Sequence, residues 1–152
     1  MLLHAVHTAE WPQEREATRD ALSAAKQKKI VLAHGASVHG LLSLRVCPGV
    51  KWLDVALLRI NHNGTMMDNI RADNETGDVP EVTAHAREIH GQGTGVISMK
   101  AIGEGRFVTP EDRDASIKYI MGLGVVDSTT IGYKSPAEID EAITRINTHL
   151  NA

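Results

Sequence analysis

Short apolar runs alternate along this chain with longer stretches in which apolar residues recur every three or four positions. The runs that read as strands are Met1–Val6, Ile30–Ala36, Trp52–Ile60, Gly95–Lys100 and Val125–Ile131. Continuous apolar runs of this length are typical of parallel strands that are buried on both faces. Their strict alternation with helices predicts an α/β fold with parallel strands and right-handed crossovers.

Helix signals fill the gaps between these strands. The predicted helices are Gln13–Lys29, the short piece Leu41–Val46, Val79–Gly91, Pro110–Gly122 and Pro136–Leu150. Helical spacing puts Ala17, Ala21 and Ala24 or Ala25 on one face of the first helix, with charges elsewhere. It predicts that the third helix turns Val82, Ala86 and Ile89 inward. Thr109 followed by Pro110 has the pattern of an N-cap with proline at the first helical position.

The last strand–helix unit has the clearest local signal. Ser135, Pro136 and Glu138 have the spacing of a capping box with proline at the first helical position. An apolar stripe follows, formed by Ile139, Ile143, Ile146 and Leu150. The turn 132–134 before this helix offers backbone N–H groups and a lysine to an anion. A phosphate site and a capped helix without a ligand therefore both remain open.

The order of the elements favours part of a barrel over a doubly wound nucleotide-binding fold. A doubly wound fold normally carries G-x-G-x-x-G after its first strand. Here the first strand is followed by HTAEWP, and Gly103-Glu104-Gly105 comes late in the chain. A complete barrel needs eight strand–helix units. We therefore expect one domain over residues 1–152, forming slightly more than half of a (β/α)8 TIM barrel with about five parallel strands.

The segment Asn61–Asp78 is polar and too long for a simple connection, so we expect it to be functional or mobile. Met66 and Met67 within it could cover a substrate or pack on the rim of the barrel.

Composition narrows the class of protein further. With 42% hydrophobic and 23% charged residues, the chain has the composition of an ordinary globular domain. A formal net charge of -3 argues against general nucleic-acid binding. Cys47 is the single cysteine, which excludes an internal disulfide and predicts a reducing compartment. We expect no signal peptide, no transmembrane segment, no metal site and a cytoplasmic location.

Five segments carry a resemblance to a known family. In chain order they are LLHAVH, AHGASVHGL, DVALLRIN, GVISMKAIGEGRF and GVVDSTTIGYKSPAEIDEAI. Together they resemble the second half of aldo/keto reductases, most closely those of the bacterial branch, over essentially the whole chain. The resemblance implies a (β/α)8 barrel that binds NADP(H) without a Rossmann domain and reduces carbonyl compounds.

The resemblance also assigns a candidate catalytic residue. The family uses a tetrad of Asp, Tyr, Lys and His, and His4 in Leu2-Leu3-His4 matches the histidine. The other three members lie in the half of the family's barrel that this chain does not match. A lone histidine can orient a carbonyl, but it cannot replace a tyrosine tuned by a lysine and an aspartate. The alternative for His4 is an inert histidine at the end of a strand.

The cofactor side of the family's site is better represented. The residues expected to hold NADP(H) by resemblance are Ser37, Asn61, Lys100, Ala101, Gly103, Gly105, Gly132, Tyr133, Lys134 and Ser135. Arg59 is an alternative to Asn61, and Lys100 is either a phosphate contact or a surface lysine. Val38 and Glu138 depart from the family's pattern, and an acidic Glu138 would repel a 2′-phosphate unless it turns back into the capping box.

Partial barrels leave sheet edges open, and this predicts association. The edge strands Met1–Val6 and Val125–Ile131 contain no proline and, apart from Asp127, none of the charged side chains that normally protect an edge. We expect a homodimer or association with a complementary half-barrel chain. The functions left open are NADP(H) binding with little or no activity alone, one half of a split reductase, and a non-catalytic interaction module.

Overall fold

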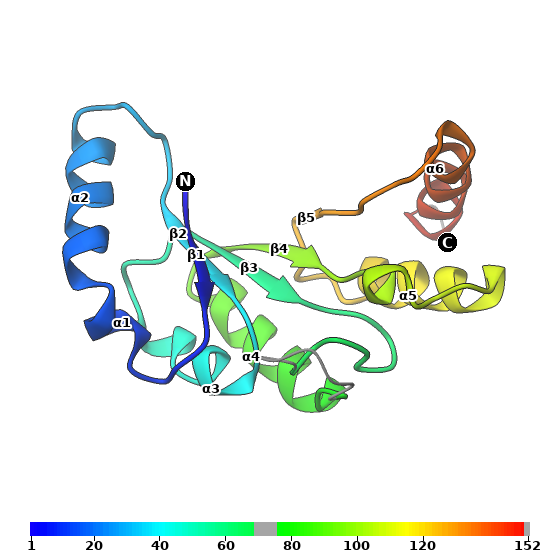
Figure 1. Cartoon of the computed structure of the whole chain (residues 1–152), viewed down its shortest axis with the longest axis horizontal. Helices are drawn as coiled ribbons and strands as arrows, with labels where there is room; N and C mark the ends of the chain where they lie inside the picture. Colours follow the sequence, from blue (N-terminus) through cyan, green and yellow to red (C-terminus); the bar gives the residue numbers. More distant parts are fainter. Residues whose placement is uncertain (69–75, 151–152) are drawn as a thin grey trace.

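A single parallel sheet organises the structure, a computed structural model that describes residues 1–68 and 76–150. Its strands are β1 (Leu2–Val6), β2 (Gly35–Val38), β3 (Val55–Arg59), β4 (Gly95–Met99) and β5 (Ser128–Thr129). They lie in the order β1-β2-β3-β4-β5, and every neighbouring pair is parallel (Figure 1). The predicted α/β class with an all-parallel sheet is confirmed, and the arrangement is consistent with half of a barrel.

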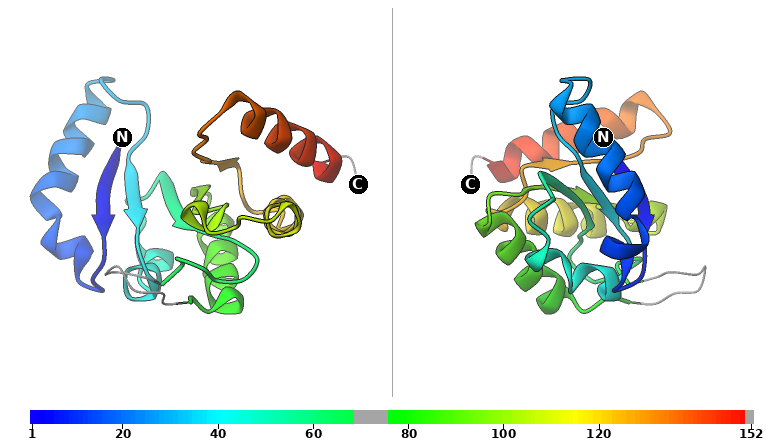
Figure 2. Two further views of the ribbon diagram at one scale, coloured as in Figure 1. Left: turned by 45° about the vertical axis from the view of Figure 1, so that its right-hand side comes forward. Right: turned by 90° about the vertical axis from the view of Figure 1, so that its left-hand side faces the viewer.

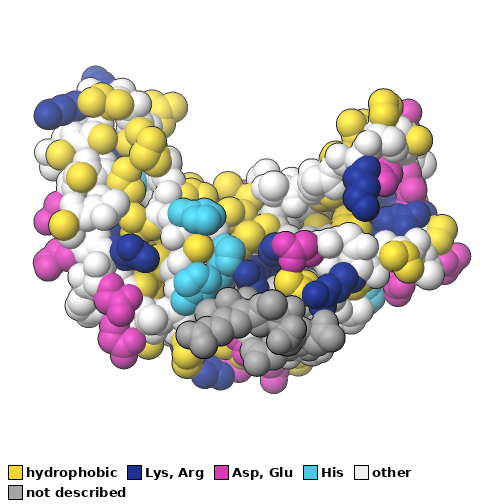
Figure 3. Space-filling view, in the orientation of Figure 1, with side chains coloured by type: hydrophobic (Ala, Val, Ile, Leu, Met, Phe, Trp, Pro, Cys, Tyr) yellow, Lys and Arg dark blue, Asp and Glu magenta, His cyan; other side chains and the backbone are white. Residues whose placement is uncertain are grey.

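Helices cover one side of the sheet and stand at its two ends. They are α1 (Trp11–Glu14), α2 (Glu16–Gln27), α3 (Leu41–Leu44), α4 (Val79–Gly91), α5 (Pro110–Gly122) and α6 (Pro136–Leu150), with 3-10 turns at Cys47–Gly49 and Gly103–Gly105. Helices α2 and α6 stand at opposite ends of the sheet (Figure 2). Between them the surface is hollowed (Figure 3), and we call this hollow the open face.

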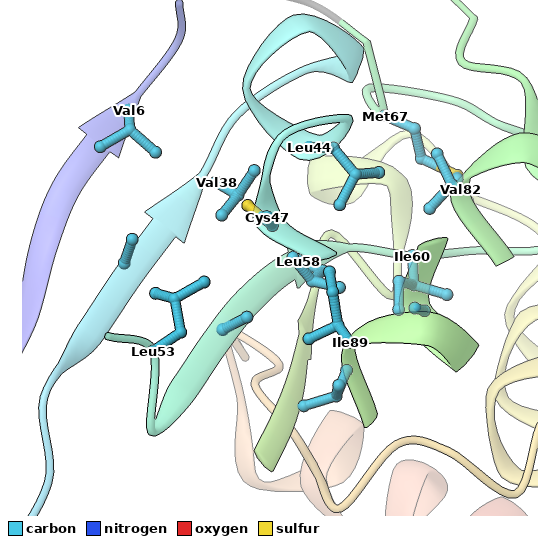
Figure 4. Close-up of a cluster of buried hydrophobic side chains, with 14 of the residues drawn as sticks. Val6, Val38, Leu44, Cys47, Leu53, Leu58, Ile60, Met67, Val82 and Ile89 are labelled. Carbon is cyan, nitrogen blue, oxygen red and sulfur yellow. The ribbon is translucent and has the colours of Figure 1, made fainter. Parts of the chain in front are cut away.

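The hydrophobic core lies between the sheet and helices α3, α4 and α5. The strand residues that enter it are Leu3, Val6, Ala36, Val38, Ala56, Leu58 and Val96, and Ile60 enters it directly after β3 (Figure 4). Each fully buried large aliphatic side chain contributes roughly 1.5–3 kcal/mol. Gly35 allows β2 and β3 to approach closely, because a Cβ there would lie 1.7 Å from the Val55 carbonyl oxygen.

The helices α4 and α5 both begin at side-chain caps, of which only the Thr109 cap was predicted. The Asp78 carboxylate accepts the Glu81 amide at 2.9 Å, and Thr109 Oγ1 accepts the Asp112 amide at 3.1 Å. As predicted, α4 buries Val82, Ala86 and Ile89. Met66 and Met67 are also buried, and Met67 belongs to the core. The segment Asn61–Asp78 to which they belong includes residues 69–75, which lie outside the described residues.

The bounds of the second strand, and the division and buried face of the first helix, differ from the prediction. The strand was expected over Ile30–Ala36 but spans Gly35–Val38, because pairing with β1 begins where Leu2 meets Gly35. Asp54 fixes this start by accepting the His34 amide at 2.9 Å. The predicted helix Gln13–Lys29 is two helices, α1 and α2, and the face that carries its alanines is not the buried one. Leu22 is the buried residue of α2, whereas Ala21 and Ala24 are exposed.

The last strand is also shorter than predicted. Only Ser128 and Thr129 of Val125–Ile131 pair, and they pair with Ile97 and Ser98 of β4. Val125, Val126 and Ile131 instead lie partly buried against the core. The apolar character of this run therefore reflects packing as well as strand pairing.

Candidate functional site

Polar side chains gather at the carboxyl ends of β1, β2 and β3. Ser37 and Arg59 belong to strands β2 and β3, and His39 directly follows β2. The His39 ring lies 5.3 Å from the His7 ring and 6.3 Å from the His4 ring, measured between centroids. Histidine side chains are visible together in the hollow of the open face (Figure 3). This is the end of a parallel sheet at which ligands of barrel folds bind.

A hydrogen-bond chain fixes the tautomer of His39. The Arg59 Nη2 donor lies 2.6 Å from His39 Nδ1, and an arginine has no acceptor atom. Nδ1 must therefore accept, so the ring proton sits on Nε2 and is donated to Ser37 Oγ at 3.0 Å. Among the described residues the Ser37 hydroxyl has no acceptor for its own proton, so Ser37 presents a hydrogen-bond donor.

Burial and neighbouring positive charge keep His39 neutral. Its pKa is lowered from 6.5 to about 4, first by burial and then by Arg59, with His7, Lys100 and His4 adding smaller effects. At neutral pH the hydrogen bonds that join Arg59, His39 and Ser37 therefore run through a neutral imidazole with its proton on Nε2.

The candidate catalytic residue His4 lies on β1 and is exposed. Its ring neighbour is His39. The two tyrosines of the chain stand elsewhere: Tyr119 hydrogen-bonds Thr83 between α5 and α4, and Tyr133 belongs to the loop before α6. The structure therefore places no tyrosine beside His4 in the role of proton donor.

Asn61 holds the backbone of two loops. Its Nδ2 donates to the carbonyls of Thr65 at 2.7 Å and Lys100 at 3.1 Å, and its Oδ1 accepts the Gly64 amide at 2.8 Å. The side chain is fully buried. All its hydrogen-bonding groups have partners, so Asn61 positions the loops after β3 and β4 instead of offering a free group to a ligand.

Four residues of the loop after β4 have a left-handed backbone conformation. Lys100 and Glu104 have φ of 60° and 58°, and Gly103 and Gly105 have φ of 52° and 83°. Lys100 Nζ pairs with Glu104 at 2.6 Å, and this hydrogen bond lowers the pKa of the Glu104 carboxyl. Buried Ala101 accepts Ser116 Oγ through its carbonyl at 2.6 Å. Lys100 is thus already paired within its own loop.

A pocket of about 310 Å³ lies between this loop, α5, the loop after β5, and α6. Its apolar wall is formed by Ile102, Phe107, Val108, Ile117, Ile131, Tyr133 and Ala142. Its charged wall is formed by Arg113, Lys134, Glu138, Glu141 and Arg145. Gly105, Gly132, Tyr133 and Lys134, all expected at the cofactor from the sequence, therefore line one pocket.

The charges of the pocket are unequally paired. Glu141 accepts Arg113 Nε at 2.8 Å and Arg145 Nε at 3.0 Å, and both arginines lower the pKa of its carboxyl. Lys134 differs, since among the described residues its ammonium has no ion-pair partner. Lys134 is therefore the cation of this pocket that is open to an anion.

The predicted capping box forms, with one shift. Ser135 Oγ accepts the Glu138 amide at 3.3 Å, and Glu138 Oε2 accepts the Lys134 amide at 2.7 Å. In the usual box the acid reaches the amide of the cap residue itself. Glu138 thus turns back onto the backbone before α6, and its own amide is capped by Ser135.

The sequence analysis missed His39 at the strand ends and the charged residues that line the pocket. His39 could have been found, because it follows Ser37 by two positions and so shares its side of the sheet. Arg113, Glu141 and Arg145 had no sequence signal, since α5 and α6 bring them together only in the fold.

Comparisons with family models, with curated proteins and with solved structures give no match to this chain. Within residues 1–68 and 76–150, no group of three His, Cys, Asp or Glu side chains could hold a metal ion. No helix in these ranges is both long and apolar enough to cross a membrane.

Proposed function

We propose that this chain is an aldo/keto reductase-like protein that binds NADP(H) at the carboxyl edge of its sheet. The observation that carries the proposal is the 310 Å³ pocket, because loops expected at the cofactor on sequence grounds form its walls. Its apolar wall suits an adenine ring, and its unpaired Lys134 suits a phosphate group.

The hydrogen-bond chain of Arg59, His39 and Ser37 on the open face suits the carboxamide end of the proposed cofactor. Ser37 offers a hydroxyl donor at the end of β2, as binding of a carboxamide oxygen requires. Arg59 and His39 hold this hydroxyl in position. When bound, the cofactor supplies a hydride; His4 on the neighbouring strand β1 can orient a carbonyl.

Reduction by this chain alone is not expected. Transfer of a hydride to a carbonyl needs a proton donor, and neither tyrosine stands at His4. The proposed function is therefore nucleotide binding with little or no activity alone. The alternatives are half of a split reductase, completed by another chain, and a non-catalytic interaction module.

Titration with NADPH, followed by its fluorescence, tests the proposal. We expect saturable binding, and a loss of at least about tenfold in affinity for Lys134→Glu, because a charge-assisted hydrogen bond is removed. Lys118→Glu on α5 is the matched control, since Lys118 is exposed and lies outside the pocket. An unchanged NADPH signal with the unsubstituted protein at millimolar nucleotide would rule the proposal out.

A further inference from the structure

The first strand contains a bulge where its histidines begin. Leu3 pairs with Ala36 of β2, but Val6 pairs with Val38, so three steps along β1 match two steps along β2. Ala5 lies inside this bulge and has a φ of 51°. Bulges are rare between parallel strands, and a positive φ strains any residue other than glycine. The fold therefore holds a strained backbone at this position.

The bulge brings two histidines to the same side of the sheet. Side chains alternate between the two faces of a regular strand, so residues three apart lie on opposite faces. Leu3 and Val6 nevertheless both enter the core. Likewise, the rings of His4 and His7 both lie beside His39 on the open face, at 6.3 and 5.3 Å between centroids. We call these three residues the histidine cluster.

Two rings of the histidine cluster have unused hydrogen-bonding groups. His39 uses both its nitrogens, one with Arg59 and one with Ser37. Within the part of the chain that the structure describes, His4 and His7 form no hydrogen bond. His4 is exposed and His7 is partly exposed. Since a neutral imidazole carries one N–H donor, the two rings offer two donors to a ligand.

The charge around the histidine cluster suits an anion. Besides burial, the groups that lower the pKa of His39 are all basic, namely Arg59, His7, Lys100 and His4. Lysine and arginine side chains lie beside the histidines in the hollow of the open face (Figure 3). Of the neighbouring carboxylates, Glu104 pairs with Lys100 and Asp68 accepts a backbone amide. A concave surface with an excess of basic groups attracts anions.

We propose that the histidine cluster binds the carboxylate or phosphate group of a small molecule, with His4 and His7 donating hydrogen bonds to its oxygen atoms. The bulge at Ala5 positions both donors on one face of the sheet. The site goes beyond the proposed function, because neither His7 nor Ala5 is among the residues expected at the cofactor. Its ligand binds without a nucleotide.

NMR titration of the imidazole signals of the full chain tests the proposal, with sodium phosphate and sodium acetate as separate ligands at constant pH and ionic strength. We expect saturable shifts of the His4 and His7 signals. Saturation with phosphate alone identifies a phosphate-bearing ligand, and saturation with acetate alone a carboxylate-bearing one. His7→Phe should raise the dissociation constant by at least about tenfold. His85→Phe on α4 is the matched control, because His85 pairs with Glu88 away from the cluster.

Substitutions at Ala5 test the role of the bulge. Ala5→Gly should bind the anion equally well and unfold at a higher urea concentration, because glycine adopts a positive φ without strain. Ala5→Val should bind it at least about tenfold more weakly, since a β-branched residue disfavours a positive φ. Full affinity in a folded Ala5→Val protein would contradict the role of the bulge.

Circular dichroism checks folding, and His4→Phe takes the place of His7→Phe if that variant unfolds. Shifts that sodium chloride reproduces, or equal affinity in His7→Phe and His85→Phe, would overturn the proposal.

Discussion

At the scale of single residues, His39 links the strand ends to the proposed cofactor site. Arg59 can only donate, so it dictates where the imidazole proton resides, and this in turn leaves Ser37 as a donor. The role of Ser37 thus depends on two residues that need not touch a ligand. Positioning of this kind commonly tunes the groups that contact a ligand.

His39 makes the folding stability depend on pH. Its pKa is 6.5 in an unfolded chain and about 4 in the fold, so between these values the unfolded chain binds the extra proton. Stability should therefore fall as the pH decreases from 6.5, before the carboxylates begin to protonate. His39→Phe should lack this component of the pH dependence. At neutral pH it should also lose about 1–3 kcal/mol, because Arg59 loses an acceptor.

Urea unfolding at pH values between 5 and 7.5 compares the two proteins, and NMR titration of the imidazole gives the His39 pKa directly. Parallel stability curves for the unsubstituted protein and His39→Phe would contradict this account, as would a His39 that titrates at its ordinary pKa.

At the scale of elements, the α6 cap sets how firmly the pocket wall is held. Ser135 Oγ accepts the Glu138 amide, so Ser135→Ala should destabilise the first turn of α6 by about 1 kcal/mol. Thr144→Ala is the control on the same helix, because Thr144 Oγ1 bonds back to the Asp140 carbonyl and alanine favours helix there. Hydrogen exchange of the α6 amides measures both, and equal effects would show that the cap has no special role.

Elements could be predicted where their signals are local. The Thr109 and Ser135 caps and the apolar face of α4 depend on neighbours in the chain, and the structure has them as predicted. The boundary of β2 could not be predicted, because Asp54, twenty residues away, anchors His34 and sets the start of pairing. The apolar stripe of α6 was predicted as Ile139, Ile143, Ile146 and Leu150, and in the structure Ile139, Ile143 and Leu150 are exposed. The ion pairs that attach α6 to α5 by another face form only in the fold.

At the scale of the whole molecule, His4 lies on β1 and the pocket lies beyond β5 at the other end of the sheet, and neither tyrosine stands beside His4. The proposed function therefore separates binding from catalysis. The isolated chain should bind NADPH yet not oxidise it in the presence of an aldehyde. Adding a half-barrel chain that supplies an Asp, a Tyr and a Lys should produce NADPH oxidation, provided the open face accepts it in place of a second copy.

In such a mixture, His4→Ala should lower the rate by about 100-fold, since a donor that orients the carbonyl is lost, while leaving NADPH affinity unchanged. His85→Ala on α4 is the control, because His85 pairs with Glu88 on the outer helix layer. Absorbance of NADPH follows the reaction, and fluorescence follows binding. Reduction by the isolated chain would show that another group donates the proton. An equal loss in both variants would show that His4 is an inert strand-end histidine.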